Sequence, residues 1–185
     1  MRKLSLALCA AVLAATPAAA QHDMSGPIVE AVANDIRQVE QKLVGLAEAI
    51  PEDNWGWRPG DGVRSIGEVF MHVAADNYFI PAMVGAEAPA ATGIRGDDYN
   101  TAVAYETRAM NKAQTIEAMR ASFAHLYGVL QMADHDALMS THDFFGNEMT
   151  GLQILVLTAT HLHEHLGQQI AYARSNDITP PWSRN

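Results

Sequence analysis

The sequence has almost no cysteine. Its single cysteine, Cys9, lies in an apolar run near the N-terminus, and the preceding Leu8 is larger than the small residue that lipoprotein processing prefers. If the N-terminal segment is cleaved after Ala20, the mature chain has no thiol for a disulfide, a metal ligand or a nucleophile. Histidine and carboxylate side chains must then supply any chemistry.

Basic charge and long apolar runs are also scarce. Lys and Arg number 12 against 21 Asp and Glu, so the net charge is −9. A surface of this sign repels phosphate backbones and anionic lipids, and we expect no nucleic acid as a partner. The apolar run at residues 4–15 is shorter than the roughly 20 residues that a membrane-spanning helix needs. We therefore expect no membrane association once the N-terminal segment is removed.

The N-terminus has the composition of an export signal. Arg2 and Lys3 precede the apolar run, and three alanines that end at Ala20 follow it. This order is typical of a Sec-type signal peptide. We expect residues 1–20 to be removed and residues 21–185 to form one periplasmic or secreted domain, which is long enough to bury a single core.

Four stretches of the chain have the spacing of amphipathic helices, with apolar residues recurring at steps of three and four. The pairs Ser65 with Glu68 and Thr150 with Gln153 have the spacing of capping boxes, in which each side chain meets a backbone amide of the first turn. Four such helices predict an all-α four-helix bundle. We expect them at residues 28–50, 66 to about 80, 112–132, and 151 to about 174–176, with Pro51 and Pro81 ending the first two.

The segments between these helices differ in character. Residues 51–62 hold Trp55 and Trp57, which we interpret as packing groups that fix an ordered connection. Residues 85–100 lack periodicity and predict a long loop that moves or lines an opening, with a helical turn or two after it. Residues 133–147 have the composition of a further loop. No strand pair with a hairpin signal is evident.

Three histidines fall within five residues of the last predicted helix. His161 and His165 are four residues apart, so their side chains lie on one helix face, about 6 Å apart at Cβ. Two imidazoles at this separation can bind one metal ion. His163 lies between them and points elsewhere. The pair alone is weak evidence, since polar residues at this spacing are common on helices.

His72 is the candidate for a third ligand. It lies among apolar residues on the second predicted helix, where an unpaired polar ring is costly to bury. A lone buried histidine is more often satisfied by a carbonyl, but metal sites in bundles do take ligands from facing helices. Three histidines leave coordination positions open, which is typical of catalytic sites. Glu68 and Asp76, each four residues from His72, are candidate partners that orient its ring.

The remaining histidines offer no further site. We interpret His22, His125, His135 and His142 as surface or loop residues. The zinc-protease motif His-Glu-x-x-His would need a histidine at position 167, which is glycine. We assign no catalytic residue from the sequence.

Local motifs resemble those of the DinB/YfiT-like superfamily of metalloenzymes. The peptides Trp-Arg-Pro and Ser-Ile-Gly-Glu ahead of His72 are similar to the segment that leads into the family's first ligand. The motif His161-x-x-x-His165-x-Gly-Gln is similar to its last helix, although Leu166 stands where the family usually has a basic or polar residue. The resemblance implies a four-helix bundle that binds one divalent metal ion through His72, His161 and His165.

The resemblance also implies a class of reaction. Several relatives are thiol-dependent transferases or isomerases that use mycothiol, bacillithiol or glutathione, and such thiols are chiefly cytoplasmic. Export therefore favours hydrolysis of a small-molecule substrate over thiol transfer. Zinc is the first choice of metal for ligands that are all nitrogen, and nickel, iron and manganese are the alternatives.

Two other functions remain open. Because no general base is evident, the chain is alternatively a non-catalytic metal-binding or stress-related protein. A wide opening onto the metal from residues 85–100 would favour an enzyme instead. The last alternative is an interaction module, whose histidines would lie far apart in the fold. Homodimerisation through exposed helix faces is a further expectation.

Overall fold

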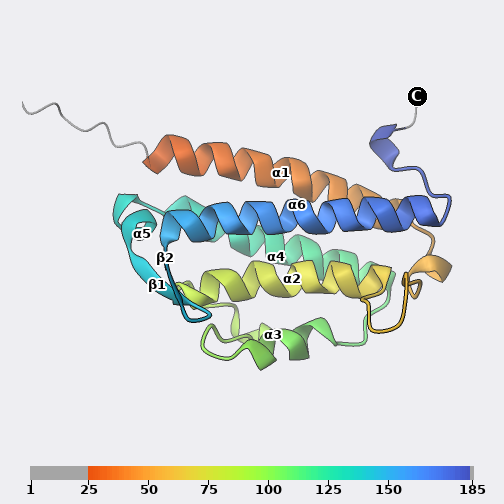
Figure 1. Cartoon of the computed structure of the whole chain (residues 1–185), viewed down its shortest axis with the longest axis horizontal. Helices are drawn as coiled ribbons and strands as arrows, with labels where there is room; N and C mark the ends of the chain where they lie inside the picture. The colour runs from red at the N-terminus through yellow and green to blue at the C-terminus, as the bar shows by residue number, and fades with distance from the viewer. Residues whose placement is uncertain (1–24, 184–185) are drawn as a thin grey trace, which may run out of the picture.

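The computed structural model describes residues 25–183, so the predicted signal peptide and His22 lie outside the described residues. No helix within the described part of the chain is long and apolar enough to cross a membrane. The expected all-α bundle is confirmed, and Figure 1 shows its four long helices: α1 (Ser25–Ala49), α2 (Ile66–Met83), α4 (Lys112–Met132) and α6 (Gly151–Ser175).

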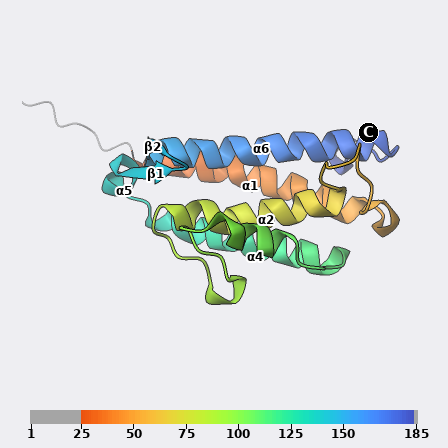
Figure 2. The same ribbon diagram turned by 60° about the horizontal axis from the view of Figure 1, so that its bottom comes forward.

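The four helices form two layers. α1 and α6 run in one direction as one layer, and α2 and α4 run in the opposite direction as the other, as Figure 1 and Figure 2 show together. The short helix α3 (Tyr99–Glu106) packs against α2 and returns the chain to the end of the bundle where α4 begins. This return allows α2 and α4 to be parallel. After α6, the 3-10 helix η3 (Pro181–Ser183) lies near α1.

Local sequence explains where α2 and α6 begin. The Ser65 hydroxyl accepts a hydrogen bond from the Glu68 amide at 3.3 Å, and the Glu68 carboxylate accepts one from the Ser65 amide at 2.6 Å. Thr150 and Gln153 form the same reciprocal pair. Each box satisfies amides that the first turn leaves without a helical partner, so both predicted starts are confirmed.

α2 continues past the residue that was expected to end it. The helix includes Pro81 and ends at Met83. Proline has no amide proton, so its place in the last turn removes a helical hydrogen bond. Pro81 is buried, and its carbonyl accepts hydrogen bonds from the amides of Val84 and Ala86, which lie just after the helix.

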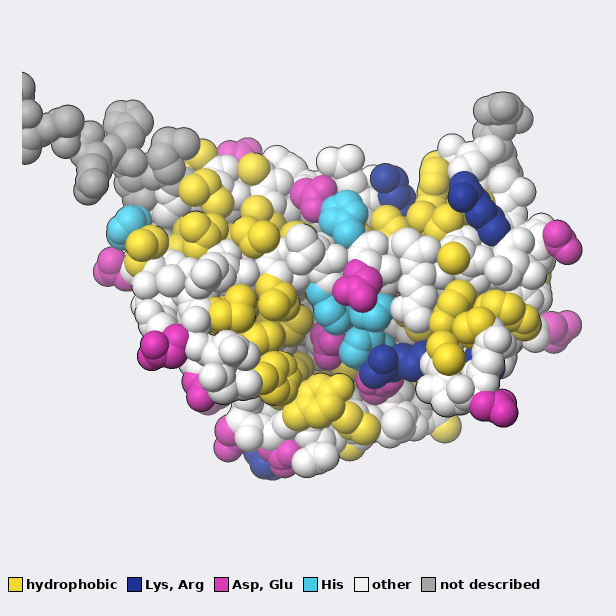
Figure 3. All heavy atoms as spheres, viewed as in Figure 1, with side chains coloured by type: hydrophobic (Ala, Val, Ile, Leu, Met, Phe, Trp, Pro, Cys, Tyr) yellow, Lys and Arg dark blue, Asp and Glu magenta, His cyan; other side chains and the backbone are white. Residues whose placement is uncertain are grey.

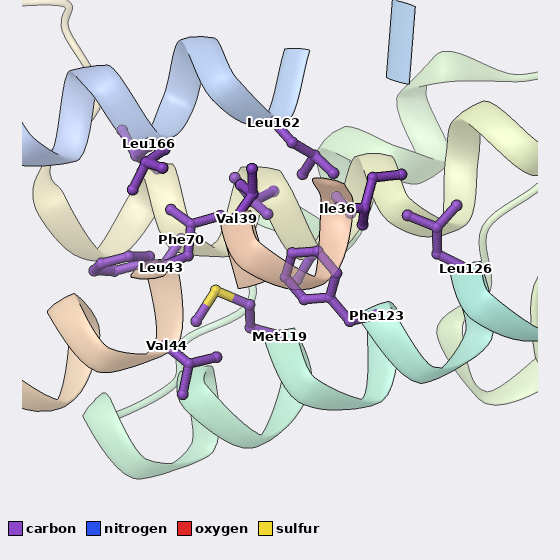
Figure 4. Packing of buried hydrophobic residues seen from close by; sticks show 14 of the residues in the cluster. Ile36, Val39, Leu43, Val44, Phe70, Met119, Phe123, Leu126, Leu162 and Leu166 are labelled. Carbon is purple, nitrogen blue, oxygen red and sulfur yellow. The ribbon is translucent and has the colours of Figure 1, made fainter. Parts of the chain in front are cut away.

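The core lies between the two layers and consists mainly of aliphatic and aromatic side chains. Ile36, Phe70, Phe123 and Leu162, one from each long helix, are at most 2% exposed. Figure 4 shows side chains from these helices pointing toward one another. Full burial of each such side chain contributes roughly 1.5–3 kcal/mol, so this core sets the spacing of the helices that carry the histidines.

The connection from α1 to α2 is ordered, as expected, and contains the 3-10 helix η1 (Glu52–Asn54). Trp55 is 8% exposed, and its ring centroid lies 5.4 Å from that of Phe70. Its indole N–H donates to a carbonyl at the C-terminal end of α1. Trp57 packs edge-on against Tyr172 of α6. The interpretation of both tryptophans as packing groups is confirmed.

The expected loop is present at residues 85–98 and contains the 3-10 turn η2 (Ala90–Thr92), whereas residues 99 and 100 already belong to α3. The loop is anchored to the end of α2 at Gly96. A Cβ at this position would lie 2.1 Å from the carbonyl oxygen of Ala82, so only glycine fits there. Asp98 then caps α3, which confirms the helical turns expected after the loop.

The stretch between α4 and α6 is more than a loop, and the expectation that the chain has no hairpin is wrong. It contains α5 (His135–Met139) and an antiparallel pair of strands, β1 (Thr141–Phe144) and β2 (Asn147–Thr150). The two-residue turn uses Phe145 at φ 54° and Gly146 at φ 82°. Such turns are usually marked by Asn-Gly or Asp-Gly, so phenylalanine in the first place concealed the signal.

Candidate metal centre

Three histidine side chains meet between α2 and α6. One ring nitrogen from each of His72, His161 and His165 lies within 4.8 Å of one nitrogen from each of the others. Their ring centroids are 4.4–5.4 Å apart. His72 and His165 are buried, and His161 is half-buried. The alternative in which the three histidines lie far apart in the fold is therefore wrong.

The antiparallel packing of α2 and α6 places these histidines opposite one another. Gln169, one turn after His165, is fully buried and donates a hydrogen bond of 2.7 Å to the carbonyl of Ile66 at the start of α2. This contact ties the two helices together in one register. His72, further along α2, then faces His165 and His161.

The Nδ1 atoms of two histidines have polar partners. His72 Nδ1 lies 3.1 Å from Glu106 Oε2, and His165 Nδ1 lies 2.9 Å from Gln168 Oε1. An oxygen at this position accepts a hydrogen bond from Nδ1–H. A neutral ring that carries its proton on Nδ1 has its lone pair on Nε2. The Nε2 atoms of His161 and His165 face each other at 3.2 Å. The cluster therefore presents Nε2 atoms toward a common centre.

Glu106 is a site residue that the sequence analysis missed. It is the last residue of α3, and its carboxylate also forms a two-point ion pair with the Arg64 guanidinium. Burial would raise the pKa of Glu106, but hydrogen bonds with His72 and Arg64 outweigh that effect and hold the pKa below its usual value. α3 is short and has no clear apolar periodicity, so no spacing signal connects positions 72 and 106.

Asp76 lies among the histidines. Its Oδ2 atom is 3.3 Å from His72 Nε2 and 3.1 Å from His161 Nε2, and its side chain is 13% exposed. The expected contact between Asp76 and His72 is thus present, although at Nε2. The expectation that Glu68 orients the His72 ring is wrong, because the exposed carboxylate of Glu68 pairs with Arg58 at 3.0 Å.

Burial keeps His161 and His165 neutral near neutral pH. It lowers the pKa of His161 to about 4, with smaller contributions from His165 and His72. Burial also lowers the pKa of His165. Neutral imidazole is the form that binds a metal ion, so these rings need no deprotonation before they do so. Burial has the opposite effect on a carboxyl group and raises the pKa of Asp76 to about 6.

The other described histidines lie outside the cluster. His163 contacts Asp35 of α1 at 2.8 Å. His135 is exposed at the start of α5, in agreement with the expectation of a surface position. That expectation is wrong for His125, which is half-buried within α4 against an aromatic ring of α2, and for His142, which is half-buried on β1. Tyr78 packs against the His125 ring with 5.1 Å between ring centroids, and His142 borders a cavity next to β1.

The cluster reaches the surface but lies outside two nearby cavities. Figure 3 shows histidine side chains in the middle of one face, with acidic and basic side chains beside them. A mainly apolar cavity of about 390 Å³ is bordered by Gly85 and Ala86, and a second of about 440 Å³ is bordered by Glu106. None of the three histidines lines either cavity. The loop at residues 85–98 therefore borders a cavity that does not contain the cluster.

Comparisons with known proteins agree with the helical architecture. The family profile of the DinB superfamily matches residues 35–169. A DinB-like protein from Bacillus cereus superposes with a TM-score of 0.67 at 17% identity, over 82% of this chain and 95% of that chain. A DinB-like protein from Bacillus subtilis superposes with a TM-score of 0.61 at 17% identity, over 80% of this chain and 93% of that chain. At this identity, the structural likeness shows the fold alone. No curated protein matches the chain.

Proposed function

The chain belongs to the DinB superfamily, and we propose that it binds one divalent metal ion through His72, His161 and His165 and uses the ion in an enzymatic reaction on a small molecule. The reaction class is transfer involving a thiol, or hydrolysis. The observation that carries the proposal is the convergence of one ring nitrogen from each histidine within 4.8 Å.

The donor set fits a divalent ion of intermediate softness. Imidazole nitrogens suit zinc first, with nickel, iron and manganese as the alternatives. The lowered pKa values of His161 and His165 leave their lone pairs free at neutral pH. Glu106 and Gln168 hold two of the rings through Nδ1, and such contacts orient imidazole ligands toward a metal.

The surroundings of the cluster suit a small polar substrate. A bound ion supplies Lewis acidity and lowers the pKa of a water or thiol at an open coordination position. Arg64 lies next to the cluster with a side chain that is 39% exposed, and Glu106 holds its guanidinium in place. A guanidinium in this position offers a partner for an anionic group of the substrate.

A non-catalytic metal-binding or stress-related function is the second candidate, and one observation favours it. His72, His161 and His165 line neither the cavity of about 390 Å³ nor the cavity of about 440 Å³. An enzyme for small molecules usually surrounds most of its substrate with a cavity, whereas a site that only holds an ion does not need one.

Metal content of the purified protein tests the shared part of both candidates. Mass spectrometry of the wild-type protein should find about one ion per chain, and His72→Ala and His161→Ala should lose it. His163→Ala is the matched control, because this residue lies on α6 but outside the cluster, and it should keep the ion. A wild-type protein without stoichiometric metal, even after incubation with zinc, nickel, iron or manganese salts, contradicts the proposal.

Activity assays separate the two candidates. The metal-loaded protein is screened for transfer of thiols to small electrophiles and for hydrolysis of esters and amides. Turnover that disappears in His72→Ala and His161→Ala and persists in His163→Ala supports the enzyme. A full complement of metal without turnover in either screen supports the non-catalytic function.

Export is a separate part of the proposal and rests on the composition of residues 1–20. The full chain is expressed in a bacterial host and the periplasmic fraction is analysed by N-terminal sequencing. The mature protein should begin at Gln21. An intact N-terminus in the cytoplasmic fraction contradicts export.

A further inference from the structure

Asp76 occupies the side of the cluster on which a metal ion would lie. Partners that only orient a metal-binding imidazole contact the nitrogen that faces away from the metal, and Glu106 and Gln168 do so at Nδ1. Asp76 instead approaches the Nε2 atoms, at 3.3 Å for His72 and 3.1 Å for His161. Its carboxylate therefore faces the same space as the Nε2 lone pairs.

The separations between these atoms suit donors that share one ion. Two ligand atoms bound at about 2.0–2.1 Å to a tetrahedral zinc ion lie about 3.3 Å apart. The Nε2 atoms of His161 and His165 are 3.2 Å apart, and Asp76 Oδ2 lies 3.1 Å from the first of them. The group of donor atoms within 4.8 Å of one another contains the three histidines and not Asp76, so Asp76 has to move toward His165 to bind the same ion.

The two helices contribute equivalent pairs of donors. His72 and Asp76 are four residues apart on α2, and His161 and His165 are four residues apart on α6. Residues at this spacing lie on one helix face, one turn apart. Because the helices are antiparallel, each pair faces the other, which is how bundles assemble metal sites with several ligands.

Among the described residues, one of the two carboxylates at the cluster has no Lys or Arg in direct contact. Glu106 is paired with Arg64 through two contacts. Among the described residues, the ion-pair contacts of Asp76 are with His72 and His161, which carry no fixed charge. A carboxylate that is 13% exposed and, among the described residues, has no Lys or Arg in direct contact is costly to bury, although Arg64 acts on it from a longer distance. A divalent ion between these side chains would remove that cost.

We propose that Asp76 is a fourth ligand of the metal ion, so that the site consists of three imidazoles and one carboxylate. This inference rests on the proposed metal binding and extends it. An oxygen ligand makes the site harder and more negative than three histidines alone, which raises its affinity for manganese relative to an all-nitrogen site.

Cobalt(II) binding to the full chain tests the assignment. Asp76→Asn keeps the shape of the side chain and removes its charge. Loss of a ligand should weaken cobalt affinity by about 100-fold or more, whereas loss of a residue that only supports a ligand weakens metal affinity by about 10–100-fold. Loss of a ligand should also change the visible spectrum of the bound ion. Asp35→Asn is the matched control, since Asp35 also contacts a histidine of α6, and it should change neither property.

The Asp76→Cys variant reports contact with the ion directly. In a Cys9→Ser background the chain has no other thiol. A thiolate that binds cobalt produces a charge-transfer band in the near ultraviolet, so Asp76→Cys should show this band and Asp35→Cys should not. Circular dichroism of each variant checks that the helices are intact.

Several results would overturn the assignment of Asp76. These are an unchanged affinity and spectrum in Asp76→Asn, or cobalt binding by Asp76→Cys without the band. Weaker affinity with an unchanged spectrum and no band also overturns it, because a residue that only positions His72 gives that result. If the wild-type protein binds cobalt and only the Asp76 results are negative, the proposed function stands. If the wild-type protein binds no metal ion at all, both proposals fail.

Discussion

Two histidines of α6 each contact an aspartate of another helix, and the two contacts have the same chemistry but different surroundings. Asp76 lies 3.1 Å from His161, and their side chains are 13% and 21% exposed. Asp35 lies 2.8 Å from His163, and their side chains are 45% and 49% exposed. The shorter contact is the one outside the candidate metal centre.

This difference shows that a short distance does not identify a functional site. His163 meets one carboxylate in solvent, where such a pair contributes little. His161 meets His165 and Asp76 under partial burial, where charges interact more strongly because less water screens them. Convergence of several groups distinguishes the candidate metal centre from an ordinary surface pair.

The largest expected effect is the loss of metal affinity when a histidine of the cluster is removed, and removal of the surface histidine His163 is its control. His165→Ala should weaken zinc binding by at least about 100-fold, because it removes a ligand and not a supporting partner. His163→Ala should leave zinc affinity unchanged, because its exposed ring contacts Asp35 of α1 outside the cluster. Competition with a chromophoric chelator measures both affinities. Equal losses in the two variants would remove the distinction between the two environments.

A smaller effect is expected from the residue that supports His72. Glu106→Gln removes the charge of the carboxylate that contacts His72 Nδ1 and should weaken zinc binding by about 10–100-fold. Glu40→Gln is the matched control, because Glu40 accepts a hydrogen bond from Tyr127 away from the cluster. Isothermal titration calorimetry measures the two affinities. Equal affinity in Glu106→Gln and Glu40→Gln would show that the contact with Nδ1 contributes nothing to metal binding.

The pKa of His161 predicts how acid changes the stability of the metal-free protein. Burial lowers this pKa to about 4, from the ordinary value of 6.5 that the unfolded chain keeps. As pH falls, the unfolded state takes up the proton first, so the stability that the neutral ring provides is complete above pH 6.5 and is lost toward pH 4. Between pH 7 and pH 5, the loss should be about 1–2 kcal/mol.

A variant isolates this contribution from that of Asp76. The pKa of Asp76 is raised to about 6, so its protonation in the folded state acts with the opposite sign as pH falls. Wild type and His161→Gln both contain Asp76, and urea unfolding at pH 7 and pH 5 gives the stability of each. The wild-type protein should lose more stability than the variant. An equal or smaller loss contradicts the lowered pKa of His161.

The smallest effect is expected at the surface pair. Asp35→Asn should change the free energy of unfolding by less than about 1 kcal/mol, because side-chain entropy and solvent oppose an exposed ion pair. Zinc binding should remain as in the wild-type protein. Urea unfolding and the chelator competition measure the two properties. A larger loss of stability would mean that the contact helps to hold α1 against α6.

Much of the helical structure follows from local causes and is predictable. The apolar spacing of residues 112–132 predicts α4 with the bounds that the structure has. The capping boxes at Ser65 and Thr150 predict the starts of α2 and α6, because each depends on a contact across three residues. The hairpin escapes prediction, since the conformation of Phe145 depends on its strands and not on its own preference for a turn.

The histidine cluster is predictable only in part. His161 and His165 form a pair by spacing alone, and the apolar neighbours of His72 indicate that its ring is buried. Their meeting is implied by the resemblance to a family, whose membership the profile match establishes. Glu106 could not be found in this way, because its distance in sequence from His72 carries no periodic signal.

The sequence by itself determines the four amphipathic helices, the starts of two of them, and the shared face of His161 and His165. These features depend on residues within about one helical turn. Only the tertiary structure decides that Glu106 contacts His72 and that Asp76 also meets His161. That arrangement depends on the register of α2 against α6 and on the path of α3, which arise from contacts between residues far apart in the chain.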